Sequence, residues 1–275
     1  VTPFFIKQLQ EIPDTETEVD VLIVSNGGDG IVPWRLISML RERFTKVGVL
    51  LPYVAYSAAT LFALGADEII MHPYSNLGPV DPQLTVPSQD GQRQIQFPAD
   101  DIRHFLEFIK HDVGITDQEE LQRSFELLAK EVGAISIGFA KRSTYLTTAL
   151  GQQILKLHMS DDSQARAISE ALNRSFYHHS FTLGLAQAKK IGLPVSAPEE
   201  PLKNLLWNVW LSFERDMECN KPFEPLQIAL EDPRISNAVF AEAPYFQIPV
   251  NLPPQLAEQY ISQWMQQIVN VRLPF

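Results

Sequence analysis

The predicted fold is decided by residues 49–83, which read VLLPYVAYSAATLFALGADEIIMHPYSNLGPVDPQ. Val49–Leu51 is a short apolar run typical of a buried strand, and Pro52 ends it. From Ser57 onward the chain carries small residues and helix formers, which predict a helix packed inside the domain. Asp67–Met71 predicts a second buried strand, and a loop rich in glycine and proline follows it. Ser57 therefore begins a helix, near the positive end of its dipole.

A second strand-to-helix junction lies upstream. Val19–Val24 is an apolar strand, and the turn SNGGDG (residues 25–30) joins it to an amphipathic helix over Pro33–Phe44. Paired glycines at such a junction let backbone N–H groups approach a ligand closely. One junction offers bare N–H groups and the other a serine, and these are the parts that acyl transfer needs.

These stretches carry a family resemblance. SNGGDG (25–30) and YVAYSAATLFALGADEIIMHPYSNLGPVDPQ (53–83) resemble the serine dehydrogenase proteinase family, relatives of signal peptide peptidase A and ClpP within the Clp/crotonase fold. FTLGLAQAKKIGLPV (181–195) is similar to the closing segment of those peptidases. The resemblance implies an α/β fold of stacked ββα units with a mostly parallel sheet. Asp81 matches the aspartate of the family's Gly-Pro-x-Asp-Pro motif, and we assign it no role.

The resemblance also implies roles for individual residues. Ser57 matches the family's nucleophile, and Gly27 and Gly28 match the glycine pair whose N–H groups form the oxyanion hole. Ala58, directly after the serine, is a further candidate donor. Ala59 departs from the pattern, because the family usually has glycine there. The alternatives are a serine that only caps its helix and glycines that only form a tight turn.

The general base is not identified by the sequence. Signal peptide peptidase A relatives use a lysine, whereas ClpP uses a histidine and an aspartate. Lys110 lies nearest to the spacing at which single-domain relatives place their lysine, so we expect a Ser/Lys dyad with Lys110. Lys130, Lys141 and His179 stay open as candidates, and the alternative for each lysine is a solvated surface position. His72 is predicted to be structural.

Composition excludes several classes of protein. A net charge of −11 argues against a nucleic-acid-binding protein, because phosphate contacts need clustered lysine and arginine. The single cysteine, Cys219, excludes an internal disulfide and a cysteine-rich zinc site. No nucleotide-binding or zinc motif is present, so we expect no cofactor and no metal. No apolar run is long enough to span a bilayer.

The composition changes after residue 195. The resemblance implies a Clp/crotonase-like serine peptidase domain over residues 1–195, followed by an extension over residues 196–275. The extension is rich in proline and aromatic residues, and we predict helices at 202–219 and 254–270. Outside the peptidase motif we predict further helices and one loop or short hairpin. The helices are Thr2–Ile12, Pro98–Asp112, two within Asp117–Met159 broken near Gly133, and 163–173; the loop or hairpin is 84–97.

The sequence thus predicts an α/β serine peptidase that hydrolyses peptide bonds through an acyl-enzyme on Ser57. Its expected partners are a peptide or protein substrate and further copies of itself, as a homo-oligomer. We expect it in the cytoplasm, or attached to a membrane through a segment upstream of Val1. The alternative function is a catalytically silent scaffold or binding protein of the same fold. A crotonase-like acyl-CoA enzyme is a weaker third reading, because those enzymes normally lack a serine nucleophile.

Overall fold

The computed structural model describes residues 1–87, 94–174 and 182–219. Thr2–Phe213 form one compact unit, and the remaining residues, Val1 and Glu214–Phe275, form a second. The predicted helix at 254–270 lies outside the described residues. The account below concerns the unit Thr2–Phe213, which contains all the candidate site residues that the structure describes.

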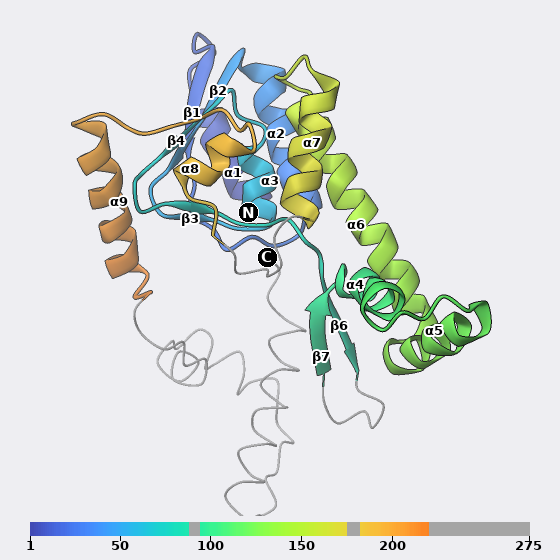
Figure 1. Cartoon of the computed structure of the whole chain (residues 1–275). Helices are drawn as coiled ribbons and strands as arrows, with labels where there is room; N and C mark the ends of the chain where they lie inside the picture. The colour runs from blue at the N-terminus through green and yellow to red at the C-terminus, as the bar shows by residue number, and fades with distance from the viewer. Residues whose placement is uncertain (88–93, 175–181, 220–275) are drawn as a thin grey trace, which may run out of the picture. The chain divides into compact units, whose positions relative to one another are not determined.

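A four-stranded parallel sheet forms the centre of this unit (Figure 1). Its strands are β1 (Glu18–Leu22), β2 (Lys46–Leu51), β4 (Glu68–Met71) and β8 (Val195–Ser196), in the order β1-β2-β4-β8. The register aligns Val21 with Val49, Val49 with Ile69, and Ile69 with Val195. Because the apolar runs of the sequence become neighbouring parallel strands, the predicted α/β fold with a parallel sheet is confirmed.

Helices cover this sheet. They are α1 (Thr2–Glu11), α2 (Ile31–Arg43), α3 (Ala58–Ala63), α7 (Asp162–Arg174) and α8 (Leu185–Lys190). All six residues of α3 are buried, because its alanines leave room for neighbouring elements. A Cβ added at Gly65, just after α3, would lie 2.6 Å from Cδ1 of Ile37 on α2. The small residues of the predicted helix therefore allow α3 to pack closely against α2.

A two-stranded sheet lies beyond the carboxyl ends of β1, β2 and β4. β3 (Val54–Ala55) pairs in parallel with β5 (Asn76–Leu77), and a parallel bridge joins Ser25 to Ala55. An antiparallel bridge links Leu77 to Leu183. This small sheet places the SNGGDG turn, the Ser57 turn and the Gly-Pro loop side by side.

A helical segment extends from the sheet (Figure 1). It comprises α4 (Asp101–Glu107), a π-helical turn η1 (Phe108–Asp112), α5 (Gln118–Val132) and α6 (Ala134–Leu155), beside a hairpin of β6 (Gln83–Pro87) and β7 (Gln94–Pro98). Gly133 separates α5 from α6 with a φ of 83°, which confirms the predicted break. The alternative of a short hairpin for residues 84–97 is also confirmed at its two strands.

The start of the predicted extension packs on the sheet unit. α9 (Leu202–Asp216) confirms the predicted helix at 202, although the helix ends three residues earlier than expected. Trp210 is buried and stacks on Tyr53 with ring centroids 4.3 Å apart. Trp207 stacks on His72 at 5.0 Å. The domain boundary after residue 195 stays a prediction.

Candidate active site

Ser57 occupies a strained turn between β3 and α3. Its backbone has φ 51° and ψ −118°. Only Ser57 and Glu218 among the described non-glycine residues have positive φ. Such a conformation is unfavourable for a residue with a β-carbon, and it persists only where the surrounding structure imposes it, often at functional sites. Ser57 is half-buried, and no described residue is a hydrogen-bond partner of its hydroxyl.

The glycine turn presses directly against this serine. Gly27 and Gly28 have φ values of 103° and 148°, which favour glycine. A Cβ added at Gly27 would lie 2.7 Å from the carbonyl oxygen of Tyr56 and 2.8 Å from the Cβ of Ser57. A Cβ added at Gly28 would meet open space. Position 27 therefore requires glycine because any side chain would collide with the Ser57 turn. Position 28 favours glycine only because of its positive φ.

The backbone N–H groups around Ser57 differ in their partners. The Gly27 N–H donates to the Ser25 hydroxyl at 3.1 Å. The N–H of Ala58, the first residue of α3, has no acceptor within its own helix. In the part of the chain that the structure describes, neither Ala58 nor Gly28 has a partner for its N–H. Among the described residues, the N–H groups of Gly28 and Ala58 therefore differ from that of Gly27, which already has an acceptor.

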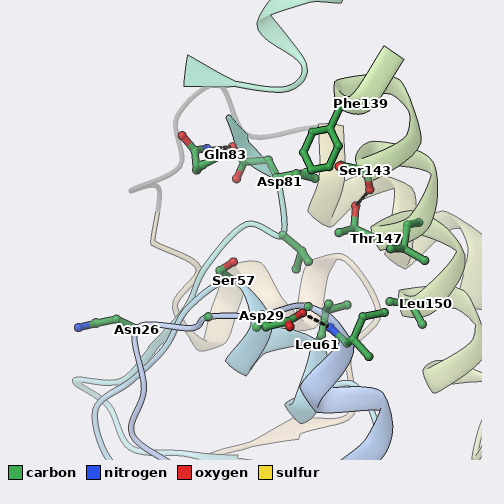
Figure 2. A pocket seen from close by; sticks show the side chains of 17 residues that line it. Asn26, Asp29, Ser57, Leu61, Asp81, Gln83, Phe139, Ser143, Thr147 and Leu150 are labelled. Carbon is green, nitrogen blue, oxygen red and sulfur yellow. Dashed lines mark hydrogen bonds between the residues drawn. The ribbon is translucent and has the colours of Figure 1, made fainter. Parts of the chain in front are cut away.

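A cavity of about 500 Å³ opens beside Ser57 (Figure 2). Four segments line it. They are the glycine turn with the start of α2, the Ser57 turn with α3, Val80–Gln83, and one face of α6. The cavity is bounded by apolar side chains, among them Leu61, Val80 and Leu150, and this composition is typical of small-molecule and peptide sites.

The α6 wall was not predicted as part of the site. It is formed by Phe139, Ser143, Leu146, Thr147 and Leu150. Their spacing of three and four residues places them on one helical face, which the sequence could have indicated. The sequence could not show that this face lies opposite Ser57, because about ninety residues separate them in the chain.

Two carboxylates contribute to the cavity. Asp81 is 8% exposed, and its carboxylate accepts a hydrogen bond of 2.8 Å from the Gln83 amide. Asp29 accepts a hydrogen bond of 2.9 Å from the Ile31 N–H at the start of α2. Neither lysine nor arginine is found among the described residues that line the cavity. The polar part of this site is therefore acidic or neutral.

The predicted base candidates lie elsewhere. Lys110 is exposed on η1, Lys130 is exposed on α5, and Lys141 is exposed on α6. None of these three lysines lines the cavity beside Ser57. His179 lies outside the described residues. Of the predicted site residues, the structure therefore gathers Ser57, Gly27, Gly28 and Ala58 at one place, and it does not bring Lys110 to the cavity wall.

His72 has a structural environment. It is buried, its ring stacks on Trp207, and its Nδ1 accepts a hydrogen bond of 3.2 Å from the Tyr74 N–H. Burial lowers the pKa of His72, and nearby Lys203 lowers it further while Glu200 opposes the shift. The ring therefore favours the neutral form and packs between β4 and α9.

The described residues contain neither a cluster of metal ligands nor a helix that could span a membrane. Within residues 1–87, 94–174 and 182–219, no three side chains among His, Cys, Asp and Glu gather as metal ligands would. None of the helices in these same ranges combines the length and apolar character needed to cross a membrane.

Comparison with known proteins gives two kinds of relative. Two uncharacterized proteins of Methanocaldococcus jannaschii, MJ1495 and MJ0137, are 26% and 27% identical to this chain over 178 and 184 residues. The matched regions cover 65% and 66% of this chain, but only 52% and 55% of the relatives. The chain thus spans about half the length of the curated relatives that it matches.

Two solved structures are similar at lower identity. Both are mutants of the 1510-N membrane-bound stomatin-specific protease, and the second is in complex with a substrate peptide. Their identities to this chain are 15% and 17%, and their TM-scores are 0.44 and 0.39. Each match covers 74% of this chain, with 73% and 69% of the other chain.

The family model of the ClpP-like SDH-type serine proteinases matches residues 5–107, a range that contains Ser57, both glycines of the turn and the Gly-Pro loop. Residues 5–107 are therefore similar to the ClpP-like SDH-type serine proteinases, and this match confirms the resemblance found in the sequence.

Proposed function

We propose that this protein is a serine peptidase that hydrolyses peptide bonds through an acyl-enzyme on Ser57. One observation carries the proposal. Ser57 has strained backbone angles, a hydroxyl without a partner in the described structure, and two free N–H groups beside it at the edge of a cavity. Strain of this kind at a half-buried serine beside a cavity is typical of nucleophiles held on strand-to-helix turns.

The reaction would proceed in two steps. The Ser57 oxygen attacks the carbonyl carbon of the scissile bond while its proton passes to a base, and a tetrahedral oxyanion forms. The C–N bond then breaks, the amine leaves with the proton from the base, and an ester to Ser57 remains. Water hydrolyses the ester by the same route, which releases the acid and restores the serine.

The Gly28 and Ala58 N–H groups are our first candidates for the oxyanion hole. Each has no other acceptor in the described part of the chain, so a developing negative charge would meet donors that are already in place. Gly27 is less suited as a donor, because its N–H is already given to Ser25. Its contribution would be the close contact of the glycine turn with Ser57.

Labelling with a fluorophosphonate tests the nucleophile. Intact mass should show one adduct per chain in the wild type and none in Ser57→Ala. Ser143→Ala is the matched control, because Ser143 is a second serine of the same cavity and should leave the adduct unchanged. A folded wild-type protein that takes no label would instead favour the catalytically silent scaffold.

The Ser/Lys dyad is tested separately. Lys110 stays the first candidate from its spacing, with Lys130 and Lys141 behind it. Each lysine is replaced by methionine, and the rate constant for labelling is measured against pH. The lysine that acts as base should be the one whose loss lowers this rate constant by about a hundred-fold or more. Equal rates in all three variants would remove these three lysines from the dyad.

Peptide or protein substrates and a homo-oligomeric assembly also belong to the proposal. Light scattering of the purified chain gives its mass in solution, and a monomer would contradict the expected assembly. Cleavage of a mixed peptide library, with Ser57→Ala as the control, tests the substrate class.

A further inference from the structure

We propose that Thr60 is a positioning residue whose hydroxyl fixes Gly78, and through it the cavity wall Val80–Gln83, against the Ser57 turn. This inference rests on the proposed peptidase function, since it concerns how a peptide would be held at Ser57. Thr60 itself does not line the cavity.

The Thr60 hydroxyl joins two segments that are distant in sequence. Its oxygen lies 2.7 Å from the Ala55 carbonyl oxygen and 2.9 Å from the Gly78 carbonyl oxygen. It also accepts a hydrogen bond of 3.1 Å from the Gly78 N–H. Thr60 is fully buried, so water cannot replace these bonds if the hydroxyl is lost.

Gly78 also packs against Tyr56, the residue that directly precedes Ser57. A Cβ added at Gly78 would lie 2.7 Å from the Tyr56 ring and 3.3 Å from the Tyr56 Cα. The backbone at Gly78 therefore touches the residue that directly precedes Ser57. Any displacement of Gly78 changes the distance between the Ser57 turn and the segment that follows Gly78.

That following segment forms the cavity wall. Val80, Asp81, Pro82 and Gln83 all line the cavity, and the Val80 N–H donates to the Leu172 carbonyl on α7 at 3.0 Å. Strand pairing between β3 and β5 ends at Leu77. Beyond Leu77 the Val80 N–H holds the wall to α7, and the Ala99 N–H donates to the Pro82 carbonyl at 2.8 Å. At the other end the Gly78 N–H lies 3.2 Å from the Ala55 carbonyl, and the Thr60 hydroxyl is the side chain that bonds to both Gly78 and Ala55.

Loss of the hydroxyl should therefore affect peptides more than small reagents. A small alkyl fluorophosphonate needs only Ser57, its general base and the oxyanion donors. A peptidyl diphenylphosphonate must also place its chain along the wall, and misplacement by about 1 Å can lower a rate on the order of a hundred-fold. The ratio of the two labelling rate constants, peptidyl over alkyl, reports the position of the wall.

The experiment compares three variants at a temperature where each is folded. Thr60→Val removes the hydroxyl at constant volume, and it should lower the ratio by roughly ten-fold or more. Thr60→Ser keeps the hydroxyl and should restore the wild-type ratio. Thr148→Val is the matched control. Among the described residues the Thr148 hydroxyl bonds only to the Thr144 carbonyl of its own helix, and Thr148 does not line the cavity.

A lowered stability with an unchanged ratio in Thr60→Val would overturn the inference, since it would show a merely structural threonine. If Thr60→Val does not fold, Thr60→Cys replaces it, because a thiol keeps the volume and hydrogen-bonds weakly. An unchanged ratio in Thr60→Cys would overturn the inference in the same way. A wild type that reacts with neither reagent would contradict the peptidase function itself, so the two failures are distinguishable.

Discussion

A β-carbon added to Gly27 would lie 2.8 Å from the Cβ of Ser57, which is closer than two such carbons can approach. The glycine turn and the serine turn are thus in direct backbone contact, although thirty residues separate them in the chain. The family resemblance indicated both glycines as one pair. In the structure Gly27 contacts the Ser57 turn, whereas Gly28 has a positive φ and open space around its α-carbon.

Gly27→Ala should abolish labelling of Ser57 by a fluorophosphonate. The added methyl meets the Tyr56 carbonyl and the Ser57 Cβ, and neither is the flexible end of a side chain. A φ of 103° adds backbone strain of about 1–2 kcal/mol for alanine. The measurements are the labelling rate constant and the midpoint of urea unfolding.

Gly28→Ala is the matched control for that variant. It carries comparable backbone strain at a φ of 148°, but its methyl points into open space. We expect a destabilisation of about 1–2 kcal/mol with partial labelling retained. Equal labelling rates in the two variants would contradict the distinction between contact and conformation.

Phe139→Ala should weaken reaction with a peptidyl phosphonate without changing stability. Phe139 lies on the α6 wall of the cavity, and its side chain is 47% exposed. Removing the ring takes away apolar surface from a bound peptide, and a roughly ten-fold lower rate constant is expected. Phe125→Ala on α5 is the control, because Phe125 is 42% exposed and does not line the cavity. The same loss in both variants would argue that the cavity is not the peptide site.

Much of the fold could be predicted because its signals are local. Val49–Leu51 and Asp67–Met71 are short apolar runs, and they become the central parallel strands β2 and β4. The small residues after Ser57 predicted a tightly packed helix, and α3 is buried throughout. Gly133 separates two helical patterns, and its positive φ ends α5 where the pattern breaks.

The site was only partly predictable because its remaining features depend on long-range contacts. The strained angles of Ser57 result from packing around the turn and leave no mark in the sequence. The engagement of the Gly27 N–H with Ser25 depends on a side-chain orientation. The sequence could indicate that these residues share one face of α6, but it could not indicate that this face lies across the cavity from Ser57. The identity of the base stays a prediction for the same reason, since spacing in the chain does not determine proximity.

Trp210→Ala should destabilise the unit Thr2–Phe213. Trp210 is 7% exposed and stacks on Tyr53, which directly precedes the strand that leads to Ser57. Loss of a buried tryptophan lowers the free energy of unfolding by about 3 kcal/mol or more. Leu205→Ala on the same helix is the control, because Leu205 is 59% exposed, and a change of roughly 0.5 kcal/mol is expected. Urea unfolding measures both, and similar midpoints would show that α9 does not stabilise the unit.

The free energy of unfolding should fall as the pH is lowered below about 6.5, and His158 should contribute to the fall. The His158 Nε2–H donates to the Leu64 carbonyl at 2.8 Å beside Arg41 and Asp67. Burial lowers the pKa of His158 below its ordinary value, and the Arg41 charge adds to this, while the bond to Leu64 and the Asp67 charge oppose it.

The sign of this effect follows from proton binding. Because the unfolded chain takes up the proton at a higher pH than the folded chain does, acid favours the unfolded state. The stabilisation is therefore fully present above the ordinary pKa of histidine, and it is lost as the pH falls toward the folded pKa. His158→Gln keeps an N–H donor for Leu64 and removes the titration. The difference between the urea midpoints at pH 7 and pH 5 should shrink in this variant, with a remainder from His72, whose pKa is lowered as well. A difference as large as in the wild type would show that His158 is not responsible.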